Sequence, residues 1–354
     1  MTWERSMMRL CGTIFVLLAL ALVALFLVVD FGEWLRIYAG KPVEDVARLY
    51  WFRSHLALVQ FAPAAIALSG GLAVTVVRRR GEWTALKALG ASPTQLVRPV
   101  AVVALVAALG LLAFQEFVVS QSGPAADRMM VERFDRWGDF LVVYSPRRWF
   151  RAGPWFVNVR GDVATLADVR LFEVQNGQLA RWLEGERLVR VGEGSWRLEK
   201  ATELTFAGPS VTGSRAGDFE LSLPLRPEIT QLAVGRPEWL PVATLAGQVG
   251  VMSALQLPTE ATRFAIHQRW ASGLAAVLAA VLTALLALSG RARPSVAMAI
   301  VSGGALYGAL FVGAMISRSL ALNGRLPPSL AAWVVPVVLL GACSLLARRV
   351  WRLA

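Results

Sequence analysis

Six runs of apolar residues, each long enough to cross a bilayer, constrain this chain more than any other feature. The hydrocarbon core of a bilayer is roughly 30 Å thick and needs a helix of about 20 apolar residues, so each run predicts a transmembrane helix. A mean hydropathy of +0.54 with only 17% charged residues agrees with that class. We therefore expect an α-helical integral membrane protein with spans at 10–29, 56–77, 96–119, 265–288, 296–317 and 330–347.

A long region between the third and fourth runs has a different pattern. Residues 155–160 and 218–223 alternate between apolar and polar side chains, which predicts β-strands with one buried face. Short strands separated by glycine and asparagine turns predict an all-β domain, either an antiparallel sandwich or an open jelly roll. Further strands are expected at 169–174, 186–191, 195–200 and 202–206.

These patterns divide the chain into three parts. Residues 1–119 hold transmembrane helices 1–3, with a cytoplasmic coupling helix at about 78–92. Residues 120–258 hold an inserted, jelly-roll-like β domain that ends in an amphipathic connector helix at about 242–257. Residues 259–354 hold transmembrane helices 4–6.

The net charge of +12 is concentrated near the ends of the apolar runs. Segments 4–9, 78–98, 291–293 and 348–352 contain twelve basic and two acidic residues, and therefore account for ten of the twelve positive charges. Alternating spans bring all four segments to the same side of the membrane, which the positive-inside rule assigns to the cytoplasm. The charge thus predicts cytoplasmic termini and an external β domain, and argues against a nucleic-acid surface.

The sequence contains no pattern typical of an active site. Its two cysteines lie in apolar runs, its two histidines lack ligand partners at metal spacing, and neither a phosphate-binding loop nor a nucleophile motif is present. We expect no catalytic residue, no metal and no cofactor. Any ATP hydrolysis linked to this chain is expected in a separate ATPase.

The polar stretch between the second and third runs is the first candidate functional segment. Trp83, Leu86, Leu89 and Gly90 follow helical spacing, so two turns of helix present an apolar face while Glu82 stays in water. We expect the surrounding residues to be too few to cover that face, which favours docking of a soluble partner. The alternative is a loop helix that lies in the lipid headgroups, with Glu82 as a local charge balancer.

Cations near the external ends of the spans are the second candidate. We expect lipid binding at three of them, Arg36, Lys41 and Arg318. Similar positions near the external ends are occupied by Arg53, Arg263 and Arg269. Guanidinium groups pair well with phosphates, so the group could meet an anionic amphiphile. The alternative for each residue is snorkelling to ordinary headgroups. The aromatic residues of the β region have two readings as well, since they either fill its core or line a groove for acyl chains.

The residues quoted above resemble the LptF/LptG family of lipopolysaccharide export permeases, formerly YjgP/YjgQ, and the resemblance covers nearly the whole chain. Its strongest part is the segment at 79–92, in which Glu82 and Ala88-Leu89-Gly90 match the family's coupling pattern E-x-x-x-x-x-A-x-G. The segments at 148–159, 195–198, 291–294 and 326–328 are similar to LptG more than to LptF.

The resemblance implies a permease subunit of an ABC transporter that extracts lipopolysaccharide from the inner membrane. Such a subunit pairs with its sister permease, LptF or LptG, sits on a dimer of the ATPase LptB, and passes its cargo through the β domain to LptC and LptA. The family's coupling glutamate corresponds to Glu82. Its phosphate-contacting lysines fall in the region of Arg36 and Lys41, where this chain has fewer cations and the additional acids Glu33, Glu44 and Asp45.

The sequence is also compatible with two other kinds of protein. A permease of a lipoprotein-releasing or mechanotransmitting ABC system also couples ATP hydrolysis to envelope work, but such permeases carry their external domain after the first span rather than the third. A passive envelope scaffold needs no motif at all. A membrane enzyme would need a carboxylate pair or a Ser/His set at membrane depth, and the six runs contain neither.

Overall fold

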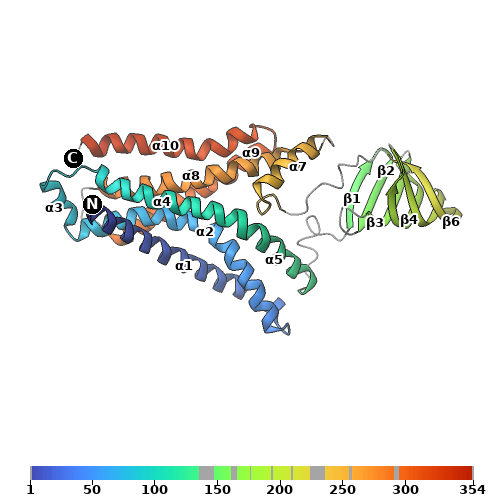
Figure 1. The fold of residues 1–354 in the computed structure, drawn as a ribbon, viewed down its shortest axis with the longest axis horizontal. Coiled ribbons are helices and arrows are strands. Elements are labelled where there is room, and N and C mark those ends of the chain that lie inside the picture. Colours follow the sequence, from blue (N-terminus) through green and yellow to red (C-terminus); the bar gives the residue numbers. More distant parts are fainter. Residues whose placement is uncertain are drawn as a thin grey trace. The chain divides into compact units, whose positions relative to one another are not determined.

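The structure is a computed structural model that describes residues 2–134, 147–160, 166–175, 177–192, 194–208, 210–223, 236–254, 257–290 and 295–352. It divides into two compact units, one formed by residues 1–135, 236–246 and 260–354 and the other by residues 136–235 and 247–259. The first is helical and the second contains the β-sheet (Figure 1). The expected helical membrane protein with an inserted all-β domain is therefore confirmed.

Six helices among the described residues are long and apolar enough to span a membrane. All six extend beyond the expected spans, and the largest differences are at the first, which runs from Thr2 to Tyr38, the second, which begins at Val43, and the third, which continues past 119. The helices of this unit are α1 (Thr2–Tyr38), α2 (Val43–Arg79), the short α3 (Glu82–Ala88), α4 (Thr94–Phe114), the π-helix η1 (Gln115–Val119), α5 (Ser120–Glu132), α8 (Glu260–Ser289), α9 (Val296–Leu322) and α10 (Pro328–Arg352). Helix α7 (Val242–Ala254) occupies most of the expected connector at 242–257.

Helix α2 is the centre of the helical unit and packs against α1, α4, α8 and α9. Small residues allow this close packing. A Cβ atom added at Gly70 would lie 2.4 Å from the carbonyl oxygen of Ala280 on α8, so no larger residue fits there without a backbone shift. The hydroxyl of Thr283 donates to the carbonyl of Ala67 at 2.6 Å, a direct hydrogen bond between the two helices. The close contact expected from Gly70-Gly71 is thus present.

One end of the helical unit gathers segments that are far apart in the sequence. The N-terminus, α3 and the C-terminus lie together at this end, which we call the α3 end (Figure 1). Arg78, at the end of α2, donates to the carbonyl of Gly290 at 2.7 Å and to that of Ala287. These bonds satisfy carbonyls that α8 leaves unpaired at its C-terminus and fix α8 against α2.

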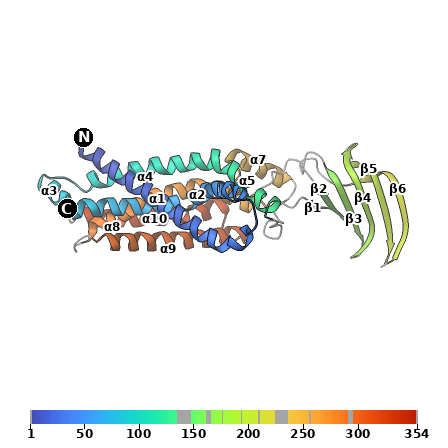
Figure 2. The ribbon, with the colours of Figure 1, turned by 90° about the horizontal axis from the view of Figure 1, so that it is seen from below.

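The sheet contains six antiparallel strands in chain order, a meander that can be followed in Figure 2. The described residues form a single sheet. They therefore do not show the two-sheet sandwich, which was one of the two expected architectures beside the open jelly roll. The strands are β1 (Arg147–Ala152), β2 (Trp155–Arg160), β3 (Ala167–Gln175), β4 (Gln178–Arg190), β5 (Ser195–Ala207) and β6 (Ser210–Ser222).

One strand prediction was wrong. The separate strands expected at 195–200 and 202–206 are a single strand, β5, with an irregular pairing to β6 between Leu198 and Ala201. Lys200 lies in this bulge with a φ of +48°, and its backbone N–H donates to Asp218 at 2.9 Å. The bulge shifts the alternation of side chains by one position, which in the sequence resembles a break between two strands.

The buried face of the sheet supplies the core of the second unit. Trp155, Val157 and Val159 alternate as expected and pack with Leu171, Leu183 and Leu198, all at most 6% exposed. Some of the aromatic residues of the sheet fill this core and others do not. Trp155 and Trp196 are in this core and Phe219 packs against it, whereas Trp149 is 61% exposed.

Candidate functional site

The coupling segment forms the expected short helix with a turn on each side. Gly81 and Gly90 flank α3 with φ values of +75° and +82°, a backbone conformation that glycine adopts without strain. Gly81 precedes the first residue of the helix, and Gly90 ends it before the turn into α4. The chain therefore makes a helix and an elbow at the α3 end, as the sequence predicts.

The apolar face of α3 is divided, which corrects one expectation. Trp83 is 9% exposed and packs into a cluster with Met7, Val77 and Leu96, and Leu86 is partly buried against the same cluster. Neighbouring residues do cover this part of the face, because the ends of α1, α2 and α4 meet beneath it. Leu89, the residue directly after α3, is 85% exposed, so it is a large apolar side chain of this segment that a partner can reach.

Glu82 lies at the start of α3 with its side chain 42% exposed. Its nearest cation is Arg80, whose Nη1 is 3.7 Å from the carboxylate. An exposed ion pair of this length adds about 0–1 kcal/mol, because water screens both charges. A cation from another protein can therefore displace Arg80 at little cost.

The cations at the opposite end of the helices do not form one free ring. Arg36 is exposed in the last turn of α1, and Lys41 is half-buried in the turn between α1 and α2. Arg318 lies on α9, which packs against α2, α8 and α10, whereas α1 packs against α2 and α4. The lipid-binding residues selected from the sequence are therefore on two different sides of α2.

Three of these cations are paired with acids of the same chain. Arg53 pairs with Asp30, Arg269 with Glu116 at 2.8 Å, and Arg318 with Glu238 at 2.5 Å. Asp30 and Glu116 lie beside or in an apolar run, whereas Glu238 lies between the sheet and α7. A count of cations in the sequence does not show that these arginines are paired with acids far away in the chain. It therefore overestimates the number of cations available to a ligand.

The Arg53 pair belongs to an aromatic cluster that ties α1 to α2. Tyr50 donates to Asp30 at 2.8 Å, and the guanidinium of Arg53 lies 5.3 Å from the ring centre of Trp34. Tyr38 packs edge-on against Tyr50, with ring centroids 5.7 Å apart. Arg53 is therefore part of the structure of the α1–α2 hairpin.

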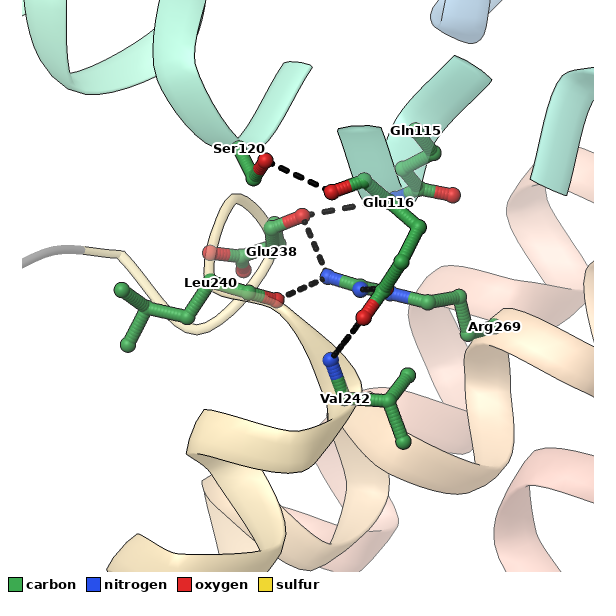
Figure 3. A network of polar contacts seen from close by, with 7 residues as sticks. All are labelled: Gln115, Glu116, Ser120, Glu238, Leu240, Val242 and Arg269. Carbon is green, nitrogen blue, oxygen red and sulfur yellow. Dashed lines mark hydrogen bonds and ion pairs between the residues drawn. The ribbon is translucent and has the colours of Figure 1, made fainter. Parts of the chain in front are cut away.

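The most connected polar network of the helical unit was not anticipated (Figure 3). Arg269 is 5% exposed, and besides its ion pair to Glu116 it donates to the carbonyls of Leu240 and Glu238 at 2.6 and 3.1 Å. Glu116 also accepts the backbone N–H of Val242 at 2.9 Å. The network therefore joins the third span, the fourth span and the segment between the sheet and α8.

The position of Glu116 explains why the sequence did not reveal it. It lies in η1, a π-helical turn that carries one extra residue and so changes the face on which the following side chains lie. Its partner Arg269 is 153 residues away. The available signal was one acid in the third apolar run and one arginine in the fourth, since ionisable residues in spans are generally paired.

A groove runs along α8 on the side that packs against α9. It consists of two cavities of about 300 and 150 Å³ that share Gln268, Ser272, Phe311 and Ala314, and we call it the α8–α9 groove. The larger cavity ends at Arg318 and Glu238, beside the network of Figure 3. The smaller cavity continues between alanines, Leu310 and Val335.

Comparison with known proteins gives one match for this architecture. The model of the family described as "Lipopolysaccharide export system permease LptF/LptG" matches residues 5–349, which include all six long apolar helices for most of their length and the whole sheet. A search of curated proteins found no match to the chain.

Proposed function

Because the chain belongs to the LptF/LptG family of lipopolysaccharide export permeases, we propose that it is the membrane subunit of an ABC transporter that lifts lipopolysaccharide out of the inner membrane. The observation that carries the proposal is the family match through both the helical unit and the sheet. In this proposal a separate ATPase dimer supplies the energy, a sister permease completes the membrane part, and LptC-like and LptA-like proteins receive the cargo. The assignment as LptG rather than LptF stays a prediction.

The unequal burial of the helices supports pairing with a sister permease. In the most apolar stretch of each span, 72% of residues are buried in α2 but only 6% in α1 and 6% in α9. The first and fifth spans thus have the most surface left for contacts outside the chain. In this proposal the lipid enters sideways, between the first span of one permease and the fifth span of the other.

The distribution of charge supports an orientation with the α3 end in the cytoplasm. Arg5, Arg9, Lys87, Arg349 and Arg352 all belong to segments that reach this end. The positive-inside rule then places both termini in the cytoplasm and the β domain in the periplasm of a multi-pass inner-membrane protein.

We assign ATPase coupling to the exposed part of α3. Leu89 offers an apolar contact and Glu82 a weakly paired carboxylate, while Trp83, Leu86 and Gly90 hold the helix and its elbow in place. For the cargo, we assign Arg36, in the last turn of the poorly covered α1, and Lys41, in the turn that follows, as the cations that pair with phosphates of the lipid.

The test is to purify the complex from native membranes and reconstitute it in proteoliposomes. The expected result is co-purification of an ATPase and a second permease, bound lipopolysaccharide, and ATP-dependent release of that lipid to a soluble periplasmic acceptor. A complex that holds no ATPase, or that releases only lipoprotein, would overturn the proposal. Fusions of alkaline phosphatase to the sheet loops and to the C-terminus test the orientation separately.

A further inference from the structure

The α8–α9 groove is longer than one leaflet of the hydrocarbon core is thick. Its lining extends along α8 from Ala261 to Ala279, which at 1.5 Å per residue is about 27 Å. One leaflet contributes about 15 Å to the hydrocarbon core, half of the total. An extended acyl chain can therefore lie in the groove from the headgroup level to beyond the middle of the membrane.

The polarity of the groove changes along this length in the way a lipid requires. Arg318, Glu238 and Gln115 line its wider end, which is the end opposite α3. The other end is formed by small and apolar side chains such as Ala279, Leu310 and Val335. A ligand that fits both ends has a charged or polar head and a hydrocarbon tail.

The charges at the wider end favour an anionic head. Arg269 is buried and donates to Glu116 and to two carbonyls, so it stays in place. Arg318 and Glu238 are 53% and 43% exposed at their side chains, and an ion pair this exposed adds little stability. A phosphate can take the place of the Glu238 carboxylate on Arg318, because guanidinium groups pair with phosphate through two parallel hydrogen bonds.

The size of the groove selects among phosphorylated lipids. Its two cavities, about 300 and 150 Å³, lie at the lower end of the range for small-ligand sites. That space suits a single chain and has no room for the many chains of the exported lipid. We propose that the α8–α9 groove binds one acyl chain of a membrane glycerophospholipid whose phosphate pairs with Arg318.

This site is separate from the proposed cargo path. It is formed within one chain, by α8 and α9 with residues of neighbouring segments, whereas the path lies between α1 of one permease and α9 of another. A bound phospholipid fills the space between α8 and α9, and the phosphate on Arg318 frees Glu238, whose backbone carbonyl belongs to the network of Figure 3. Occupancy of the groove therefore sets how α9 is held against the rest of the bundle.

The experiment uses the full-length protein in nanodiscs with a diazirine-labelled phosphatidylethanolamine, followed by mass spectrometry of the labelled peptides. We expect labels on the residues of α8 and α9 that line the groove. Ala314→Trp fills both cavities and should reduce this labelling about tenfold. The matched control is Ala309→Trp, an exposed position on the same helix, which should label like the wild type.

The role of the phosphate is tested with Arg318→Gln and with Arg325→Gln as a control at an exposed arginine nearby. Arg318→Gln should reduce labelling by the phospholipid but not by a diazirine-labelled diacylglycerol, which has no phosphate. If Ala314→Trp fails to fold, Ser272→Leu narrows the same part of the groove. Wild-type labels outside the groove, equal labelling of Ala314→Trp, or labelling of the groove only by diazirine-labelled lipopolysaccharide would each overturn the proposal, whatever the export assay shows.

Discussion

Helix α2 is largely buried within the chain, whereas α1 and α9 are largely uncovered. This difference in burial separates the helix that holds the fold together from the helices that are free to contact a partner or a lipid. Helix α2 contains alanines and glycines, packs against α1, α4, α8 and α9 among others, and is 72% buried in its most apolar stretch. Helices α1 and α9 are as apolar, yet only 6% of the corresponding residues are buried. Small residues allow backbones to approach, and those of α2 pack against α8 in the tight centre of the unit. Helix α9 is also rich in alanine and glycine, so its low burial reflects its position at the edge of the unit rather than its composition.

The same contrast separates the charged pairs. Arg269 and Glu116 lie inside the bundle and hold three segments together, whereas Arg318 and Glu238 lie at its surface. A polar group in an apolar medium needs a partner, so the inner pair cannot be opened without loss of stability. The outer pair can exchange partners, which is the property needed of a ligand site. Exposure of the side chain, rather than residue type, therefore identifies the cations that are available for a function.

The largest predicted effect comes from breaking the inner pair. Arg269→Ala leaves Glu116 without its cation in an apolar environment, and should lower the free energy of unfolding by about 3–5 kcal/mol. Chemical denaturation in detergent micelles, followed by circular dichroism, measures the change. Arg318→Ala is the matched control and should cost at most about 1 kcal/mol. Equal losses for the two variants would contradict the distinction between the pairs.

The second prediction compares the buried Trp83 of α3 with the exposed Leu89 that directly follows it. Trp83→Ala removes a buried ring and should lower the free energy of unfolding by about 3 kcal/mol. Leu89→Ala should leave stability within about 0.5 kcal/mol and weaken binding of the ATPase about tenfold. Denaturation of the purified subunit gives the first value, and titration of the ATPase onto the permease complex gives the second.

Glu82→Ala extends this test to the charge. It should weaken ATPase binding without affecting membrane insertion, because its present partner Arg80 is only a surface contact. Arg79→Ala, a neighbouring change with the same loss of a charged side chain, serves as the control. Unaltered co-purification of the ATPase with Glu82→Ala would rule out the coupling role of this carboxylate.

The sequence predicted most of the fold because its strongest signals are local. Apolar runs and period-two alternation depend on neighbouring residues, and they correctly identified the six helices and the inserted sheet. The division of 195–206 into two strands failed because a bulge at Lys200 breaks the alternation without ending the strand. The sequence pattern does not distinguish these two cases.

The sites were harder to predict because they depend on contacts between distant segments. Nothing near Trp83 in the sequence indicates that Met7 and Leu96 will cover it. Likewise, the pairing of Glu116 with Arg269 needs the π-helical turn and the packing of two spans. Residue types and spacing indicated where polar groups occur, and only the fold shows which of them are already satisfied.

The third prediction compares a glycine of α2 with one of α9. Gly70→Ala places a methyl group 2.4 Å from the carbonyl oxygen of Ala280, and the resulting shift of α8 should cost about 1–3 kcal/mol. Gly304→Ala adds the same group in open space and should be neutral or stabilising by up to about 1 kcal/mol, because alanine favours helix. Thermal unfolding of both variants in the same detergent checks the difference. A comparable loss for Gly304→Ala would mean that α9 is covered in the isolated protein.

The smallest effect is expected at the uncovered helix α1. Arg36→Gln combined with Lys41→Gln removes two cations that are exposed or half-buried, so stability should change by less than about 0.5 kcal/mol. If these cations meet the phosphates of the cargo, stimulation of the ATPase by lipopolysaccharide should fall about twofold, and the salt dependence of that stimulation should weaken. Arg48→Gln, an exposed cation early in α2, is the control. An unchanged response in the double variant would assign both residues to ordinary headgroup contacts, since screened surface charges without a specific ligand contribute nothing to the coupling.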